Sequence, residues 1–226
     1  MINRARQIRI RQTGASLSLA IVACATIAGC KSHGEVVVDE GVGITAIRTA
    51  CPAVGIADYT GDVTLFQPPT AREASAIDVT AAMTNVRSQC DPAPDKVHST
   101  VSFSVLASRN TKQGARSVTL PFYITVVRGT TAVIAKRIGQ VTVNFADGQD
   151  RAQATGQATA MIDKAEATLP ADIRKRLTEK RKAGEADAAI DPLSLPDVSE
   201  AVSRATFEVM VGFQLTDDQL QYNVTR

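Results

Sequence analysis

Apolar and polar residues alternate along most of this chain with a period of two, and this pattern constrains the fold most strongly. A period of two places every second side chain on one face of an extended strand, whereas an amphipathic helix needs a period near 3.6. In the last such segment, Phe207, Val209, Val211, Phe213 and Leu215 share one face. The sequence therefore predicts a domain built from strands, each burying one face.

Five further segments repeat the alternation. They are 76–87, with Ile77, Val79, Ala81 and Met83 on one face; 97–108, with Val97, Val101, Val105 and Ala107; 117–128, with Val118, Leu120, Phe122, Ile124 and Val126; 131–145; and 152–163. Gly129-Thr130 is a turn signal, so we expect 117–128 and 131–145 to form a hairpin whose second arm ends at Asp147-Gly148.

The segment 152–163 is ambiguous because it is rich in alanine. The helix propensity of alanine favours a helix. Against this, Ala154, Gly156, Ala158 and Ala160 alternate with mainly polar residues, which favours a strand. We predict a strand here.

Seven or eight antiparallel strands with few helices predict an all-β fold, an immunoglobulin-like β-sandwich in a loose sense. The chain has no Trp and so lacks the Cys-Trp-Cys pattern of antibody domains. We expect this domain to cover residues 51–226. Near its end, Thr216 and Gln219 have the spacing of a capping box, which predicts a short helical turn.

A helical insertion is expected near 171–190, where the alternation stops. Ile173 and Leu177 give only a narrow apolar stripe, which predicts an exposed helix. Pro192 and Pro196 follow, and we expect them to hold the chain extended up to the last strand.

The same insertion is strongly basic, with six basic and two acidic side chains between 172 and 182. The basic residues are Arg174, Lys175, Arg176, Lys180, Arg181 and Lys182. Two interpretations stay open. The segment contacts anionic lipid head groups or an acidic partner, or it is a solvated helix with a basic face.

The N-terminus has the parts of a bacterial export signal in order. Residues 1–14 carry four Arg and no acid, and the apolar run from Ala15 to Ile27 is shorter than the about 20 residues that span a bilayer. The run ends in Ile27-Ala28-Gly29-Cys30, which resembles the lipobox of bacterial lipoproteins. The resemblance implies that residues 1–29 are a signal peptide that is removed, and that Cys30 becomes the lipidated first residue.

Lipidation would anchor the protein to a membrane, facing the periplasm. Cys30 would be diacylated on its sulfur and acylated on its amine, with palmitate as an expected chain, and three chains hold a protein far more firmly than one. Residues 30–50 would be the lipidated N-terminus and tether. Lys31, where inner-membrane lipoproteins tend to have Asp, favours the outer membrane.

Cleavage would also change the charge. The chain has 25 Lys and Arg against 23 Asp and Glu, and losing the four leader arginines leaves 21 against 23, a net charge of −2. The pI of 8.4 therefore does not argue for nucleic acid. Aromatic residues make up only 4% of the chain, too few to favour a base-stacking surface. We expect no nucleic-acid partner.

The four cysteines suit an oxidising compartment. Cys24 would leave with the leader and Cys30 would carry lipid, which leaves Cys51 and Cys90. Two such cysteines in a periplasmic protein predict a disulfide. A metal or redox pair is the alternative, but no CxxC spacing or nearby His supports it.

The body of the chain resembles an uncharacterised group of alphaproteobacterial envelope lipoproteins. The resemblance rests on Cys51-Pro52, Cys90, Leu120-Pro121-Phe122-Tyr123, Val211 to Thr216, Leu220 and Tyr222-Asn223, after the lipobox. It covers most of the chain from Cys30, and the basic segment is extra to it. The group has no assigned activity, so the resemblance implies fold and location only.

No motif indicates an enzyme. The chain has no Gly-x-Ser-x-Gly, phosphate-binding or EF-hand pattern, and its only histidines are His33 and His98. The pair Asp217 and Asp218 is better explained by a helix N-terminus. We predict no enzyme, no cofactor and no metal.

Two function classes remain open. The first is an envelope accessory, scaffold or protein-binding subunit that contacts an envelope protein through a sheet edge or loops. The second is a binder or carrier of a small apolar ligand or lipid between the sheets. A cavity along the small 154–160 face would favour the carrier, whereas a filled core with exposed apolar edge residues would favour the protein binder.

Overall fold

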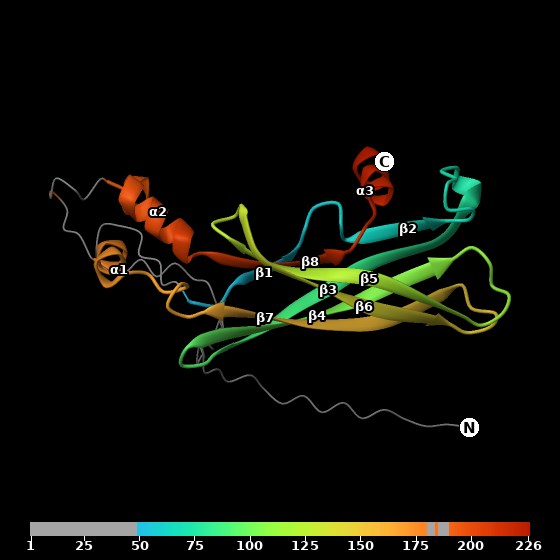
Figure 1. Cartoon of the computed structure of the whole chain (residues 1–226), viewed down its shortest axis with the longest axis horizontal. Coiled ribbons are helices and arrows are strands. Elements are labelled where there is room, and N and C mark those ends of the chain that lie inside the picture. The colour runs from blue at the N-terminus through green and yellow to red at the C-terminus, as the bar shows by residue number, and fades with distance from the viewer. Residues whose placement is uncertain (1–48, 180–183, 185–189) are drawn as a thin grey trace, which may run out of the picture. The chain divides into compact units, whose positions relative to one another are not determined.

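In the part of the chain that the structure describes, eight strands form two four-stranded sheets that pack face to face as a sandwich (Figure 1). The computed structural model describes residues 49–179, 184 and 190–226. The strands are β1 (Ala53–Ile56), β2 (Asp62–Phe66), β3 (Ile77–Pro92), β4 (Lys96–Arg109), β5 (Arg116–Arg128), β6 (Ala132–Phe145), β7 (Arg151–Asp163) and β8 (Phe207–Phe213). One sheet has the order β1-β8-β5-β6 and the other β2-β3-β4-β7. The predicted all-β sandwich is confirmed.

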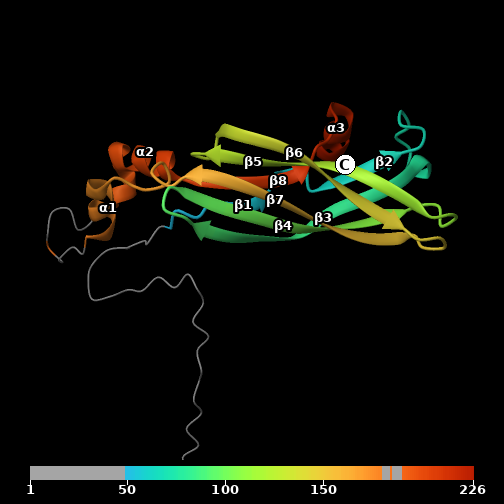
Figure 2. The ribbon, with the colours of Figure 1, turned by 60° about the horizontal axis from the view of Figure 1, so that its bottom comes forward.

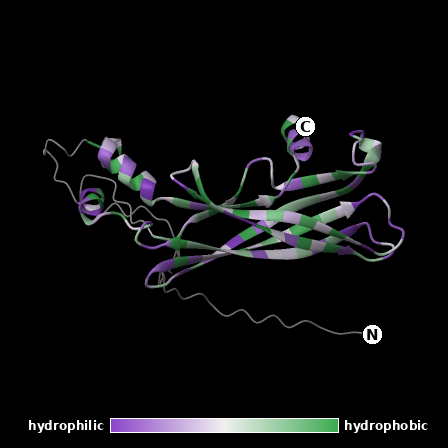
Figure 3. Ribbon diagram, viewed as in Figure 1, coloured by the Kyte–Doolittle hydropathy of each residue, from purple (hydrophilic) through white to green (hydrophobic). Residues whose placement is uncertain are grey.

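The six alternating segments all form strands, β3 to β8, and their apolar faces meet in one core between the sheets. In β4, Val97, Val101 and Val105 are fully buried. The ambiguous segment is a strand, because β7 pairs with β4 along its whole length. Hydrophobic and hydrophilic bands succeed one another along the strands in Figure 3. The predicted hairpin of β5 and β6 is also present.

Two short strands escaped prediction, and one strand direction was wrong. β1 and β2 have only four and five residues, too few for alternation to stand out. β1 runs parallel to β8, whereas the other strand pairs are antiparallel. β8 ends at Phe213 and not at Leu215. Gln214 still donates its N–H to the carbonyl of Pro121, but Pro121 has no N–H to return, and a helix follows from Asp217.

Three helices accompany the sheets in the described part of the chain: α1 (Ala171–Thr178), α2 (Pro196–Ala205) and α3 (Asp217–Thr225). Two 3₁₀ turns lie at Ala74–Ala76 and Pro192–Ser194. In Figure 2, α1 and α2 lie together at one end of the sandwich, and α3 lies beside β2. The expectation of extended chain after Pro192 is wrong. Pro196 is the first residue of α2, a position that needs no N–H and already has the φ of proline.

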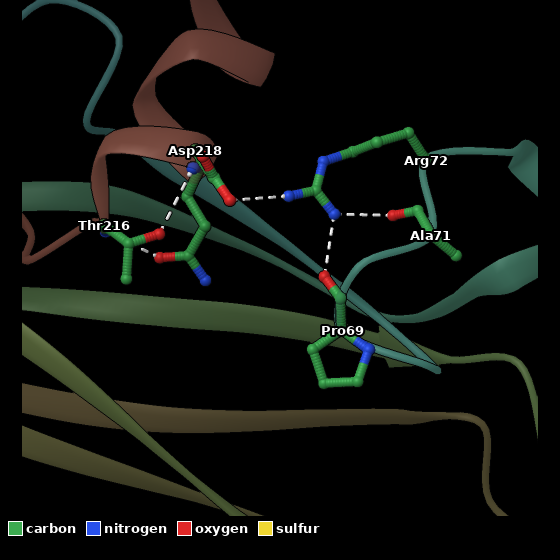
Figure 4. Close-up of polar contacts among 6 residues, drawn as sticks. Pro69, Ala71, Arg72, Thr216 and Asp218 are labelled. Atoms are coloured by element: carbon green, nitrogen blue, oxygen red, sulfur yellow. Dashed lines mark hydrogen bonds and ion pairs between the residues drawn. The ribbon is translucent and has the colours of Figure 1, made fainter.

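The predicted capping box opens α3. The N–H of Gln219 donates to Thr216 Oγ1 at 3.3 Å, and the N–H of Thr216 donates to Gln219 Oε1 at 2.9 Å (Figure 4). Arg72, in the loop after β2, contacts Asp218 at 3.2 Å. Asn223 is buried and donates to two backbone carbonyls around β2. These contacts fix α3 against the edge of the β2-β3-β4-β7 sheet.

Two phenylalanine rings fill the middle of the sandwich. Phe103 of β4 and Phe122 of β5 pack edge to face with ring centroids 4.9 Å apart. Each ring covers a glycine of the neighbouring edge strand. A Cβ atom on Gly156 of β7 would lie 2.2 Å from the Phe103 ring, and one on Gly139 of β6 would lie 2.6 Å from the Phe122 ring. The small residues of β7 therefore make room for Phe103 and do not line a cavity at this point.

Candidate functional site

Cys51 and Cys90 form the predicted disulfide, which links the two sheets. Cys51 precedes β1 of one sheet, and Cys90 lies in β3 of the other. A bulge in β3 makes this possible. Met83, before the bulge, is buried in the core, and Asn85 within it has a φ of 52°. The bulge adds one residue, so Val86 and Cys90, at even positions, contact the core instead of facing solvent.

The basic segment is partly helical, and its apolar stripe packs against another helix. Ile173 is buried and packs with Leu177 against Val198 and Ala201 of α2. The expected fully exposed helix is therefore corrected to a helix docked on α2. The helix ends at Thr178, and Lys180, Arg181 and Lys182 lie outside the described residues.

One of its described charges is already paired. Arg176 donates to Asp197 of α2, and this hydrogen bond holds the pKa of the Asp197 carboxyl below its ordinary value. Arg174 and Lys175 are exposed. Contact of this segment with an anionic surface stays a prediction. Among the described residues, Arg174 and Lys175 are the basic side chains that could make this contact.

Residues 1–48, including Cys30 and the expected leader, lie outside the described residues. Lipidation at Cys30, removal of residues 1–29 and the tether thus stay predictions. Along the described part of the chain, no helix combines the length and the apolar character needed to cross a bilayer. No cluster of three or more potential metal ligands occurs among these residues either.

The first half of β6 is a free edge with apolar side chains in solvent. β6 is the last strand of its sheet, so no described strand pairs with one side of its backbone. Val133, Ile134 and Ile138 are 62%, 50% and 65% exposed. Every residue from 132 to 138 is exposed, so this stretch buries neither of its faces. Free edges of this kind are where other chains add a strand.

The second half of β6 is fixed in the core. Val141, Val143 and Phe145 are buried, with polar residues between them. Arg109, buried at the end of β4, lies 5.2 Å from the Phe145 ring centroid. It donates hydrogen bonds to the carbonyls of Lys112, Ala146 and Gln149. The loop after β6 is thereby held, which leaves the first half as the available part of the edge.

A small hollow of about 70 Å³ lies between this part of β6 and the end of β7. Ala135, Lys136 and Arg137 line one wall, and Thr159, Ala160 and Met161 line the other. Ile124 and Val126 of the core lie in its lining as well. The hollow could receive a small apolar side chain from a strand beside β6.

The free half also carries two adjacent basic residues, Lys136 and Arg137. Neither forms an ion pair with a described residue. The ammonium of Lys136 lies 4.7 Å from the ring centroid of Tyr123 on β5. We call Val133, Ile134, Lys136, Arg137 and Ile138 together the β6 edge patch. It combines apolar surface with two positive charges that no described acidic residue pairs.

A second, larger hollow of about 830 Å³ lies on the β2-β3-β4-β7 sheet. Thr64, Thr80, Ser108 and Gln153 are among its lining residues, and none comes from a strand of the other sheet. It therefore lies on the outer face and not between the sheets. Arg226, which pairs with Asp62, borders it.

The β6 edge patch was not singled out from the sequence, although a signal was present. Val141 to Phe145 alternates strictly, whereas Val133, Ile134 and Ala135 are consecutive apolar residues followed by two bases. Loss of alternation within one strand indicates a stretch without one buried face.

Comparisons of the chain with protein-family models, with curated proteins and with solved structures find no match. The resemblance to alphaproteobacterial envelope lipoproteins therefore stays a prediction that rests on the sequence alone.

Proposed function

We propose that the protein is a lipid-anchored, non-catalytic envelope protein that binds an extended segment of a protein partner along the free edge of β6. The observation that carries the proposal is the first half of β6, where Val133, Ile134 and Ile138 lie in solvent beside an unpaired backbone edge. An exposed apolar edge strand is a hazard in a protein that acts alone, because it pairs with other chains.

The chemistry of the patch specifies the partner segment. Backbone hydrogen bonds to a free edge supply affinity, and pockets for alternate side chains supply specificity. The hollow beside Ala135 suits a small apolar side chain. Lys136 and Arg137 favour a segment that also carries acidic residues.

The alternative function, carriage of a small apolar ligand between the sheets, has less support. Phe103 and Phe122 occupy the space above the glycines of β7 and β6. A filled core with exposed apolar edge residues is the arrangement that favours protein binding. We therefore adopt the protein-binding function.

Site-specific photo-crosslinking in intact envelopes tests the partner. A photoreactive residue replaces Ile138 in the patch or, as a matched control, Gln157 on the exposed face of β7. We expect one abundant adduct from position 138 and little from position 157, with the cross-linked partner peptide carrying apolar and acidic residues. Equal adducts at both positions, or none at 138, would contradict the proposal. Lipid co-purifying with the protein instead would favour the carrier.

The anchor is tested separately by Cys30→Ala. The lipobox predicts that this variant loses the acyl mass and is no longer retained on membranes as the mature protein, and Lys31 predicts that the wild-type protein fractionates with the outer membrane. Normal processing and membrane pelleting of Cys30→Ala would remove the anchor from the proposal. It would leave the β6 edge patch unaffected.

A further inference from the structure

We propose that, when no partner is bound, the β6 edge is covered by residues Glu35–Glu40 of this same chain. This inference rests on the proposed role of β6 as a strand-accepting edge, and it names the occupant that a partner would have to displace. The segment reads Glu35-Val36-Val37-Val38-Asp39-Glu40 and lies outside the described residues.

The composition of the segment complements the β6 edge patch. Three consecutive valines have high strand propensity and match the apolar side chains of the patch. The three acids that flank them match Lys136 and Arg137, which have no described acidic partner. Pairing of β6 with β6 of a second copy has no such match, since it would bring four basic side chains together.

The register of the sheet places the start of the domain near the patch. Ala53 of β1 lies opposite Glu208 of β8, Glu208 opposite Val127 of β5, and Val127 opposite Val133 of β6. The four residues form one row across the sheet. Three strand spacings of about 4.8 Å put Val133 about 14 Å from Ala53 along this row.

The chain is long enough to cover this distance. Ala50 packs on the core, and Cys51 is held by the disulfide, so the free part of the chain ends there. Ten residue steps separate Glu40 from Ala50. They span up to about 33 Å when extended, which exceeds the about 19 Å of the four strand spacings between β1 and a strand added beyond β6. Gly41 and Gly43 give the connection freedom to turn.

The topology also sets the direction of the segment. β1 is parallel to β8, and β5 is antiparallel to both β8 and β6, so β1 and β6 run the same way and start at the same end. A segment that leads into the start of β1 therefore runs along β6 in the opposite direction. This is the antiparallel arrangement, which a short connection allows.

One antiparallel register gives the segment both a charge pair and an apolar pair with the β6 edge patch. It places Asp39 opposite Lys136 and Val37 opposite Ile138 on one face. On the other face, Glu40 lies diagonal to Arg137, within reach of a long side chain. Docking in this register would also leave only five residue steps between Cys30 and Glu35, and would hold the domain close to its anchor.

Disulfide trapping tests the register in the full chain, purified in detergent as the host processes it. One variant combines Val37→Cys with Ile138→Cys, and the matched control combines Val37→Cys with Gln157→Cys on β7. We expect the 37–138 link to form within one chain at least about tenfold faster than the control link. In the same background, Asp39→Lys should slow trapping about threefold, the size of one exposed cross-strand pair, and adding Lys136→Asp should restore it.

The outcomes separate this inference from the proposed function. A 37–138 link between two chains would overturn the assignment to the same copy. Equal rates for the two cysteine pairs would overturn docking altogether. If trapping fails while photo-crosslinking at position 138 still captures a partner, the inference is wrong and the proposed function stands. If trapping succeeds and no partner is captured, the segment is the permanent cover of the edge and the proposed function fails.

Discussion

β6 and β7 are both edge strands, and they follow each other in the chain. They line a shared hollow, yet they expose different kinds of side chain to solvent. The exposed positions of β7 are mostly polar, with Thr155, Gln157 and Thr159 in its middle. The corresponding half of β6 exposes Val133, Ile134 and Ile138. Polar side chains on β7 discourage pairing with another chain, whereas on the first half of β6 only Lys136 and Arg137 interrupt the exposed apolar residues.

The interior does not explain the difference. Each edge strand contributes a glycine, Gly139 or Gly156, to make room for a core phenylalanine. The two strands therefore pack against the core in the same way and differ in the side chains that they expose to solvent. The apolar surface of β6 is therefore not forced by the core.

Removing the disulfide should have the largest effect on stability and no effect on the difference between the exposed surfaces of β6 and β7. Cys51→Ser with Cys90→Ser opens a link across a sequence separation of 39. We expect a loss of about 3–4 kcal/mol in the free energy of unfolding, from loop-closure entropy. Urea unfolding of the two forms measures it. At a temperature where the variant is folded, cross-linking from position 138 should persist, and its loss would mean that the edge patch depends on the disulfide.

Filling the edge-strand glycines should destabilise both strands to a similar degree. Gly156→Ala and Gly139→Ala force a methyl group into the rings of Phe103 and Phe122. We expect about 1–3 kcal/mol for each, as for other overpacked cores. Gly55→Ala is the control, because its Cβ would meet Met210 at an ordinary 3.6 Å. A neutral Gly156→Ala would show that Phe103 does not fill the space over β7.

An ion pair between the two sheets, near the end of β6 at Phe145, should make the free energy of unfolding depend on pH. Arg116 of β5 donates two hydrogen bonds to Asp78 of β3, at 2.7 and 2.6 Å, and holds the pKa of the Asp78 carboxyl below its ordinary 3.8. A lowered carboxyl pKa adds stability above that ordinary value, and the gain is lost as pH falls through the lower pKa of the folded state.

Asp78→Asn tests this ion pair. We expect a loss of about 1 kcal/mol at pH 7, because the pair is bidentate but partly exposed. The difference from the wild-type protein should shrink as pH falls below 3.8, the ordinary value for Asp. Asp58→Asn, at an exposed residue outside any described ion pair, is the control. A loss that does not depend on pH would assign the effect to packing.

Changing the edge patch itself should have the smallest effect on stability. Ile138→Thr removes exposed apolar surface and keeps the branched side chain that suits a strand. We expect the free energy of unfolding to stay within about 0.5 kcal/mol, as for other surface substitutions. Thr155→Val on β7 is the reciprocal change. Binding of an apolar dye should fall in Ile138→Thr and rise in Thr155→Val. A large loss of stability in Ile138→Thr would mean that Ile138 is a core residue.

The sequence predicted most of the fold because alternation is a local signal. It identified β3 to β8, including β7 with its many alanines, and Thr216 and Gln219 were enough for the cap of α3. It could not predict β1 and β2, because four or five residues carry little periodicity, nor the parallel pairing of β1, which depends on the whole sheet. Pro196 was misread because proline ends some helices and begins others.

The candidate site was less accessible from sequence. The Cys51–Cys90 pair followed from counting cysteines. The inward orientation of Cys90 did not, because it depends on the extra residue of the bulge at Asn85. The free edge of β6 depends on strand order, since a central strand would have both sides of its backbone paired. Sequence alone cannot tell an edge strand from a central one when both are apolar.

Hydrogen exchange of the two edge strands measures the contrast most directly. The protein carries Val36→Ser, Val37→Ser and Val38→Ser, so that its own segment no longer competes, and a peptide with residues 31–48 is added in trans. We expect amide exchange in residues 133–139 of β6 to slow on peptide addition, while exchange in residues 151–163 of β7 does not change. Unchanged exchange in β6, or equal protection of both strands, would contradict docking of residues Glu35–Glu40 on the β6 edge.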